Sequence, residues 1–117
     1  MSLDCADPRA EAEFWAALLD GDVIFSTNSA VGVRSEPIRL TAIQVDGYSP
    51  PSWPADDVPK QIHLDVEVTD LEASVARALR LGARLATHQP APDRWRVLLD
   101  PAGHPFCLTT QVPDETP

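Results

Sequence analysis

The sequence predicts an α+β fold in which one βαβββ unit is used twice. An extended run ending in aspartate, an amphipathic helix and a glycine occur in this order at the start of the chain and again after its middle, and three strand-like runs follow each copy. One such unit has an apolar sheet face that it cannot bury alone, so the two copies are expected to pack into one domain. Residues at matching places in the copies would then converge on a shared concave surface.

The first copy begins with the extended run Leu3–Asp7 and continues as a helix over Pro8–Leu19. Asp7 predicts the helix start because its carboxylate accepts from free backbone N–H groups, and proline suits the first helical position. We interpret Glu11 as a first-turn acid favoured by the positive helix end. Gly21 is expected to end the helix. The apolar face and the strands expected after the helix are Ala10, Phe14, Ala17 and Leu18, then Val23–Ser26, Ala30–Arg34 and Ile38–Val45.

The second copy opens with a strand over Ile62–Val68, whose alternation puts His63, Asp65 and Glu67 on one face. Thr69 and Asp70 precede a helix over Leu71–Leu81, and Gly82 closes it. The remaining strands expected are Arg84–His88, Arg94–Leu99 and Phe106–Thr110, with a tight turn at Asp100–Gly103. We therefore divide one domain into a first module (residues 1–46), a proline-rich linker (47–61), a second module (62–110) and a tail (111–117).

Composition limits the possible partners. The chain has 117 residues and a net charge of −9, with its arginines scattered, which disfavours binding to nucleic acid or to anionic membranes. No apolar run approaches the ~20 residues of a membrane helix, and no signal peptide is visible, so a cytoplasmic location is expected. Two cysteines are too few for a disulfide framework and are expected to be thiols.

Three groups of residues resemble the glyoxalase-like subgroup of the vicinal oxygen chelate superfamily, which includes glyoxalases, bleomycin-resistance proteins and extradiol dioxygenases. They are Asp4–Pro8 with Phe14, Trp15 and Leu19; Gln61–Val66 leading to Asp70, Leu71 and Leu81–Ala83; and Trp95–Leu98 followed by Asp100–Leu108. The resemblance covers nearly the whole chain. It implies two modules with curved, mainly antiparallel sheets around a cleft, and a homodimer.

The resemblance also implies a metal site whose ligands come from the first and last strands of each module. His63 lies seven residues before the cap aspartate Asp70, where the family has a ligand, and Gln44 falls at the family's usual glutamate. Cys107 stands where the pattern Gly-x-x-x-Glu-Leu has its glutamate, so a thiolate would change the softness of the site. The fourth position would fall ahead of Met1, which leads us to expect an incomplete site and either a trimmed chain with a vector-derived leader or the internal start of a longer one. The cofactor is therefore none, or a divalent zinc, nickel, manganese or iron ion.

Each candidate residue also has a plain structural interpretation. His63 is a metal ligand or general base, or a strand histidine bonded to backbone; Glu67 and Asp65 assist it or are merely solvated. Cys107 is a metal ligand or, as we favour, a buried apolar residue. Trp53 in the linker and Trp95 would wall a pocket for a flat or apolar molecule, with Asp65 beside them, or they pack in a core. His104 is expected to be exposed on the surface or to make hydrogen bonds that stabilise its turn, and Trp15 is expected to pack in the core.

Three functions remain open at this point. The first is a binding domain of the glyoxalase and bleomycin-resistance type for a small apolar or aromatic molecule, with a degenerate metal site. The second is a metal-dependent lyase, isomerase or dioxygenase that uses His63 with Gln44 and Cys107. The third is a non-catalytic dimerisation module of a longer protein.

Overall fold

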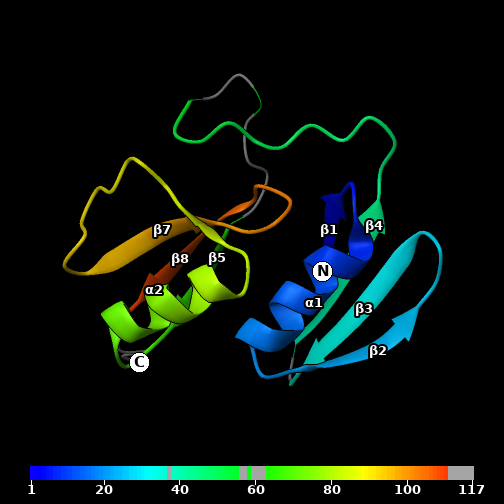
Figure 1. The fold of residues 1–117 in the computed structure, drawn as a ribbon, viewed down its shortest axis with the longest axis horizontal. Coiled ribbons are helices and arrows are strands. Elements are labelled where there is room, and N and C mark those ends of the chain that lie inside the picture. The colour runs from blue at the N-terminus through cyan, green and yellow to red at the C-terminus, as the bar shows by residue number, and fades with distance from the viewer. Residues whose placement is uncertain (37, 56–57, 59–62, 111–117) are drawn as a thin grey trace, which may run out of the picture.

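The computed structural model describes residues 1–36, 38–55, 58 and 63–110 and confirms the α+β class, with two helices and two four-stranded sheets (Figure 1). The strand orders are β1-β4-β3-β2 and β5-β8-β7-β6, so the two sheets have the same topology. In each, the first strand runs parallel to the last, and the other neighbours are antiparallel. The elements are β1 Ser2–Cys5, α1 Pro8–Leu18, β2 Asp22–Ser26, β3 Ala30–Ser35, β4 Ile38–Gln44, β5 Leu64–Glu67, α2 Leu71–Arg80, β6 Arg84–Leu85, β7 Trp95–Leu99 and β8 Pro105–Thr109.

Both helices begin at the expected aspartates. The Asp7 carboxylate accepts from Ala10 N at 3.1 Å, and Asp70 accepts from Ala73 N at the same distance. The second helix is followed by Gly82 at φ +115°, as predicted. The first ends differently, because Asp20, not Gly21, takes the positive φ. Gly21 is needed for another reason: a Cβ there would lie 2.5 Å from the Arg34 carbonyl oxygen.

The strand expected at Arg84–His88 is shorter and ends at Leu85. One further backbone bond joins Ala86 N to the Val97 carbonyl at 3.0 Å, and the side chain of Gln89 takes the other bonds there. The Gln89 amide donates to the carbonyls of Ala86 and Val97, at 2.8 Å each, and its oxygen accepts from Val97 N at 2.9 Å. These bonds satisfy backbone N–H and C=O groups that would otherwise pair with a neighbouring strand. The predictions for residues 61–62, for most of the later linker and for the tail from 111 onward lie outside the described residues, and the module boundaries remain predictions.

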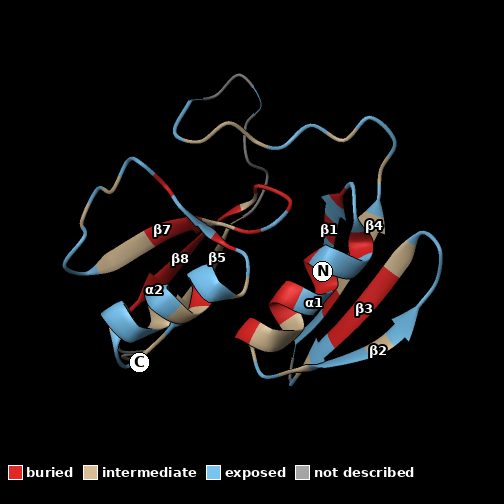
Figure 2. Ribbon diagram, in the orientation of Figure 1, coloured by how far each residue is buried: buried red, intermediate tan, exposed pale blue. Residues whose placement is uncertain are grey.

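Side chains join the two modules across one continuous core (Figure 2). The Trp15 ring of α1 lies 5.0 Å from the Phe106 ring of β8 and 5.2 Å from Phe14, in edge-to-face geometry. Arg77 of α2 donates to the carbonyls of Ala17 and Leu18 at the end of α1, at 2.7 and 3.2 Å. This core holds both sheets in place, so the open face of the second sheet is presented in a fixed geometry.

The predicted apolar face of α1 is partly wrong. Phe14 and Leu18 are buried, but Ala10 is exposed. Glu11 lies in the first turn, as predicted, and it is also buried, at 1% exposed, which was not predicted. α1 is therefore oriented with Glu11, Trp15 and Leu18 at the centre of its buried face, and these residues follow one another at intervals of four and three.

Candidate functional site

The alternation predicted for β5 is confirmed. Leu64 and Val66 pack against the core, whereas Asp65 and Glu67 are exposed on the opposite face. β8 lies beside β5 with Asp65 in register with Cys107, and directly paired residues point to the same side of a sheet. His63, immediately before β5, has a side chain 29% exposed and is oriented to that same side.

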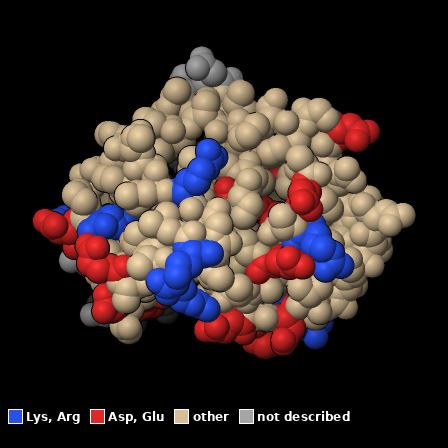
Figure 3. Space-filling view, viewed as in Figure 1, with Lys and Arg blue, Asp and Glu red and all other residues tan. Residues whose placement is uncertain are grey.

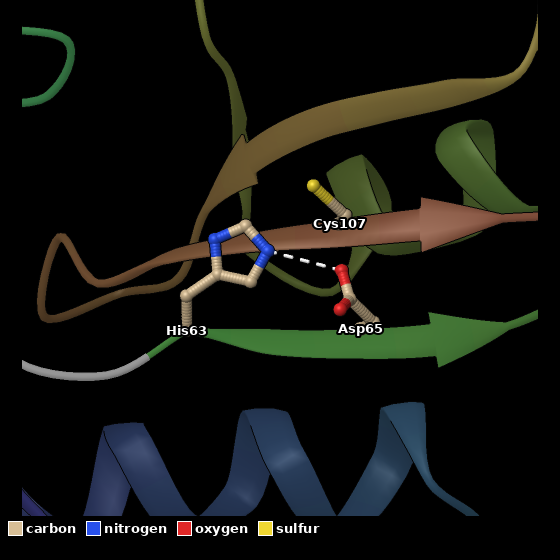
Figure 4. Close-up of side chains that lie close together, drawn as sticks. All are labelled: His63, Asp65 and Cys107. Atoms are coloured by element: carbon tan, nitrogen blue, oxygen red, sulfur yellow. Dashed lines mark hydrogen bonds and ion pairs between the residues drawn. The ribbon is translucent and has the colours of Figure 1, made fainter.

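The structure brings His63, Asp65 and Cys107 together (Figure 4). His63 Nε2 lies 3.0 Å from Asp65 Oδ1, and one ligand atom from each of the three residues lies within 4.8 Å of the others. A carboxylate oxygen only accepts, so Nε2 carries the hydrogen and Nδ1 is left as the lone-pair nitrogen when the imidazole is neutral. The group therefore presents an imidazole, a carboxylate and a thiol on adjacent strands.

Aromatic side chains flank the thiol. Cys107 is buried with Ala86 and Val97 in a small cluster against which Trp53 and Trp95 pack. The Trp53 ring also lies 5.5 Å from the exposed His88 ring. The two tryptophans predicted as pocket walls are thus beside one of the predicted ligands, and Cys107 is both buried, as we favoured, and next to His63.

Two predicted site residues lie outside this group. Glu67 is on the same face of β5 but is paired with Thr109, two residues beyond the Asp65–Cys107 pair. Gln44 ends β4 in the other sheet, exposed and in register with Cys5, on the side of β4 that carries Leu40 and Ala42 under α1. The position of Gln44 does not support a role as a metal ligand, and this role remains a prediction.

The donor set can be tested against a metal ion on its chemistry. Imidazole nitrogen and thiolate sulfur suit zinc and other borderline cations better than manganese or magnesium, which prefer oxygen. The three atoms are close enough to share one ion, so the residues fit a zinc-like cation. Without a metal ion, His63 and Asp65 would form a polar pair for acid–base chemistry or ligand binding, because the carboxylate fixes the orientation and tautomer of the imidazole.

An apolar cavity of about 210 Å³ opens between the modules, on the side of β5 that carries Leu64 and Val66 and opposite the His63 group. Its first-module wall contains Trp15, Leu19, Ile38 and Leu40, and its second-module wall is the β5 strand, including Asp65. The lining of this cavity is mainly apolar, as the linings of small-molecule sites usually are. On the face shown in Figure 3, acidic and basic side chains are interspersed, with no continuous basic patch among the described residues.

Sequence reasoning missed a second set of polar residues at the module interface. Glu11 and Asp100 are both buried, and Tyr48 and His104 lie against them. The available signal was the position of Glu11, which falls four residues before Trp15 and seven before Leu18, on the face that the helix buries. The His104 side chain is 17% exposed. Its backbone N donates to Asp100 Oδ1 at 2.8 Å within the turn, and its Nε2 donates to the Asp4 carbonyl of β1 at 2.7 Å.

The glyoxalase-like domain family model matches residues 1–109, and the chain belongs to this family within the vicinal oxygen chelate superfamily. No protein among the curated sequences matches it. No helix of the described residues has the length and apolar character needed to cross a bilayer.

Three solved structures illustrate the shared fold. The fosfomycin resistance protein FosX from Listeria monocytogenes, a mutant complexed with Mn(II) and 1S,2S-dihydroxypropylphosphonic acid, is 14% identical, with a TM-score of 0.72, over 95% of this chain and 86% of that one. The bleomycin-binding protein of Streptomyces verticillus, complexed with copper(II)-bleomycin, is 22% identical, with a TM-score of 0.59, over 95% and 93%. A glyoxalase/bleomycin resistance protein/dioxygenase family enzyme from Burkholderia phytofirmans PsJN is 18% identical, with a TM-score of 0.70, over 92% and 93%. At these identities the likeness shows the fold alone.

Proposed function

We propose that this chain is a small-molecule-binding domain that takes an apolar or aromatic ligand on the open face of its second sheet. The observation that carries the proposal is the convergence of His63, Asp65 and Cys107 beside two half-buried tryptophans, Trp53 and Trp95. The aromatic rings offer apolar area, and the His63–Asp65 pair offers one oriented polar anchor. Structural relatives complexed with bleomycin and with a dihydroxypropylphosphonic acid support a small ligand rather than a macromolecule.

Thermal shift with a panel of metal-free aromatic compounds tests this proposal. A binding compound is expected to raise Tm in the wild type, and Trp95→Ala and Asp65→Asn are expected to reduce the shift. Asp93→Asn is the matched control, because Asp93 is exposed in the turn before β7, and its substitution should leave the shift unchanged. A shift that survives in both site variants would place the ligand elsewhere.

A second candidate is a metal-dependent lyase, isomerase or dioxygenase, favoured by the same three donor atoms. The bound ion would act as a Lewis acid, and the chain's own contribution would be to hold it with His63, Asp65 and Cys107. Elemental analysis after purification, with cobalt(II) substitution followed by absorption spectroscopy, tests this directly. A sulfur-to-cobalt charge-transfer band that disappears in Cys107→Ser, with stoichiometric metal lost in His63→Ala, supports the enzyme; a metal content unchanged in both variants rejects it.

We further infer a homodimer in the cytoplasm. Three large apolar side chains of the first sheet, those of Val23, Phe25 and Ile38, are exposed by 42%, 38% and 46%, and a second copy would cover part of this apolar surface. Sedimentation equilibrium should give twice the chain mass, and Val23→Asp should lower it. A monomer at all concentrations would reject the dimer.

A further inference from the structure

Two buried carboxyl groups join the modules at a place separate from the His63 group. Glu11 comes from the first turn of α1 and is 1% exposed, and Asp100 comes from the turn between β7 and β8 and is fully buried. Their backbone link is Ala102 N, which donates to Glu11 Oε1 and to Asp100 Oδ1, at 3.1 Å each. Two acids sharing one donor are a costly arrangement unless a proton or a cation lies between them.

Asp100 has the surroundings of a carboxylate anion. Besides Ala102 N, it accepts from the Trp15 indole at 2.9 Å and from His104 N at 2.8 Å. All three partners of Asp100 are donors, as an ionised carboxylate requires. A protonated Asp100 would have no acceptor among these three for its own hydrogen.

Glu11 has the opposite surroundings. Its Oε2 is buried and has no hydrogen-bond partner among the described residues. A second bare anion in this position would carry a large desolvation penalty, whereas a neutral carboxylic acid would donate from Oε2 to Asp100. Burial first, and the neighbouring Asp100 carboxyl second, raise the pKa of Glu11 to about 10.

None of the charged or titratable neighbours among the described residues supplies a positive charge that could replace a proton between Glu11 and Asp100. Asp4 and Cys5 of β1, Asp7 at the helix cap and Tyr48 before the linker surround the pair, and all are neutral or acidic. His104 Nε2 lies 4.0 Å from Glu11 Oε2, but its hydrogen is committed to the Asp4 carbonyl, so this nitrogen has no lone pair for a metal ion.

We propose that Glu11 keeps a proton at neutral pH and shares it with Asp100, and that this proton fastens the 100–104 turn of the second module to α1 of the first. Loss of the proton would place two anions against each other and release the turn. β8 starts directly after this turn and carries Cys107, so the pair is a pH-sensitive link between the module interface and the strand of the His63 group. A cavity of about 270 Å³, lined by Glu11, Cys5 and Tyr48 among others, borders the Glu11 side of the pair.

Urea unfolding of the full chain between about pH 6 and about pH 9 tests the proposal. Because the folded state binds the Glu11 proton more tightly than the unfolded state, this group's effect on stability is most favourable below the ordinary pKa of 4.5 and worsens as the pH rises toward about 10. The unfolding equilibrium constant of the wild type should therefore rise with pH, by up to about tenfold per unit from this group. Glu11→Gln can donate to Asp100 and accept from Ala102 N without titrating, so its slope should be smaller by one proton.

Glu13→Gln is the matched control, since Glu13 is on the same helix with a side chain 58% exposed and should keep the wild-type slope. Carboxyl ¹³C NMR of Glu11 in the wild type provides a readout that does not depend on the variant folding, and a protonated chemical shift at neutral pH is expected. An ionised shift, or parallel slopes for wild type and Glu11→Gln, would overturn the proposal. Stabilisation of the wild type by added Ca²⁺ or Mn²⁺ that Glu11→Gln abolishes would also overturn it, because the occupant would then be a metal ion.

Discussion

The Trp15 indole donates to the Asp100 carboxylate at 2.9 Å, across 85 residues of sequence and between the two modules. The same ring packs edge-on against Phe106, so one side chain supplies both apolar contact and a buried hydrogen bond at the interface. The two sheets share no ladder in the described residues, and contacts of this kind hold them together.

Trp15→Phe should separate these two contributions. The phenyl ring keeps most of the packing, but Asp100 loses one of its three donors while remaining buried, so we expect a loss of about 1–3 kcal/mol in the free energy of unfolding. Urea denaturation measures it. Trp95→Phe, a half-buried tryptophan on the open face, is the control and should cost less; equal losses would mean that the Asp100 bond contributes nothing beyond ring size.

Arg77→Met should weaken the contact between the two helices. The last turn of α1 has no basic residue of its own, and Arg77 supplies the positive charge and the donors to its carbonyls from α2. We expect a loss of about 1–2 kcal/mol in urea denaturation. Arg80→Met, at the exposed end of the same helix, should stay close to the wild type, and a similar loss there would show that helix charge in general is responsible.

Gly103→Ala and Gly47→Ala form a pair that isolates one steric contact. Both glycines have positive φ, +90° and +69°, so both substitutions carry a backbone cost of about 1 kcal/mol. A Cβ at Gly103 would also lie 2.7 Å from Pro50 Cβ, whereas one at Gly47 meets nothing within 4 Å. Thermal denaturation should therefore show the larger loss for Gly103→Ala. The reverse order would mean that Pro50 moves aside freely.

Cys5 should resist alkylation in the folded protein. Burial first, followed by the nearby Glu11 carboxyl, raises its pKa from 9.0 to about 11, which lowers its thiolate fraction by about 100-fold. In a Cys107→Ser background, which leaves Cys5 as the single thiol, iodoacetamide at mildly alkaline pH should label it slowly by intact-mass analysis, and raising the pH should speed the reaction. Comparable rates in native and denatured protein would contradict the burial of Cys5.

The fold was predictable because its local signals are independent of tertiary contacts. Asp7 and Asp70 at the helix starts, the alternation in β5 and the tight turn after Leu99 all follow from short-range physics, and the repeated order of elements supplied the topology. The shortening of β6 was not predictable, because the side chain of Gln89 takes backbone bonds there and nothing in the local pattern marks it.

The candidate site was predictable in part. Alternation placed His63 and Asp65 on one face, but the register that puts Cys107 opposite Asp65 depends on the pairing of strands far apart in sequence. The first-turn position of Glu11 was predicted, but its burial was not, because a charged residue near a helix start is usually solvated and only the packing of α1 against the second module buries it.

The division of the tryptophans between two environments has an optical consequence. Trp15 is sealed in the interior, while Trp53 and Trp95 are half exposed beside Cys107. The fluorescence of this chain should contain a short-wavelength emitter that reports on the joint between the modules and a long-wavelength pair that reports on the proposed ligand face. A compound stacking on the outer pair would quench the red edge of the spectrum alone, so occupancy could be followed without attaching a dye.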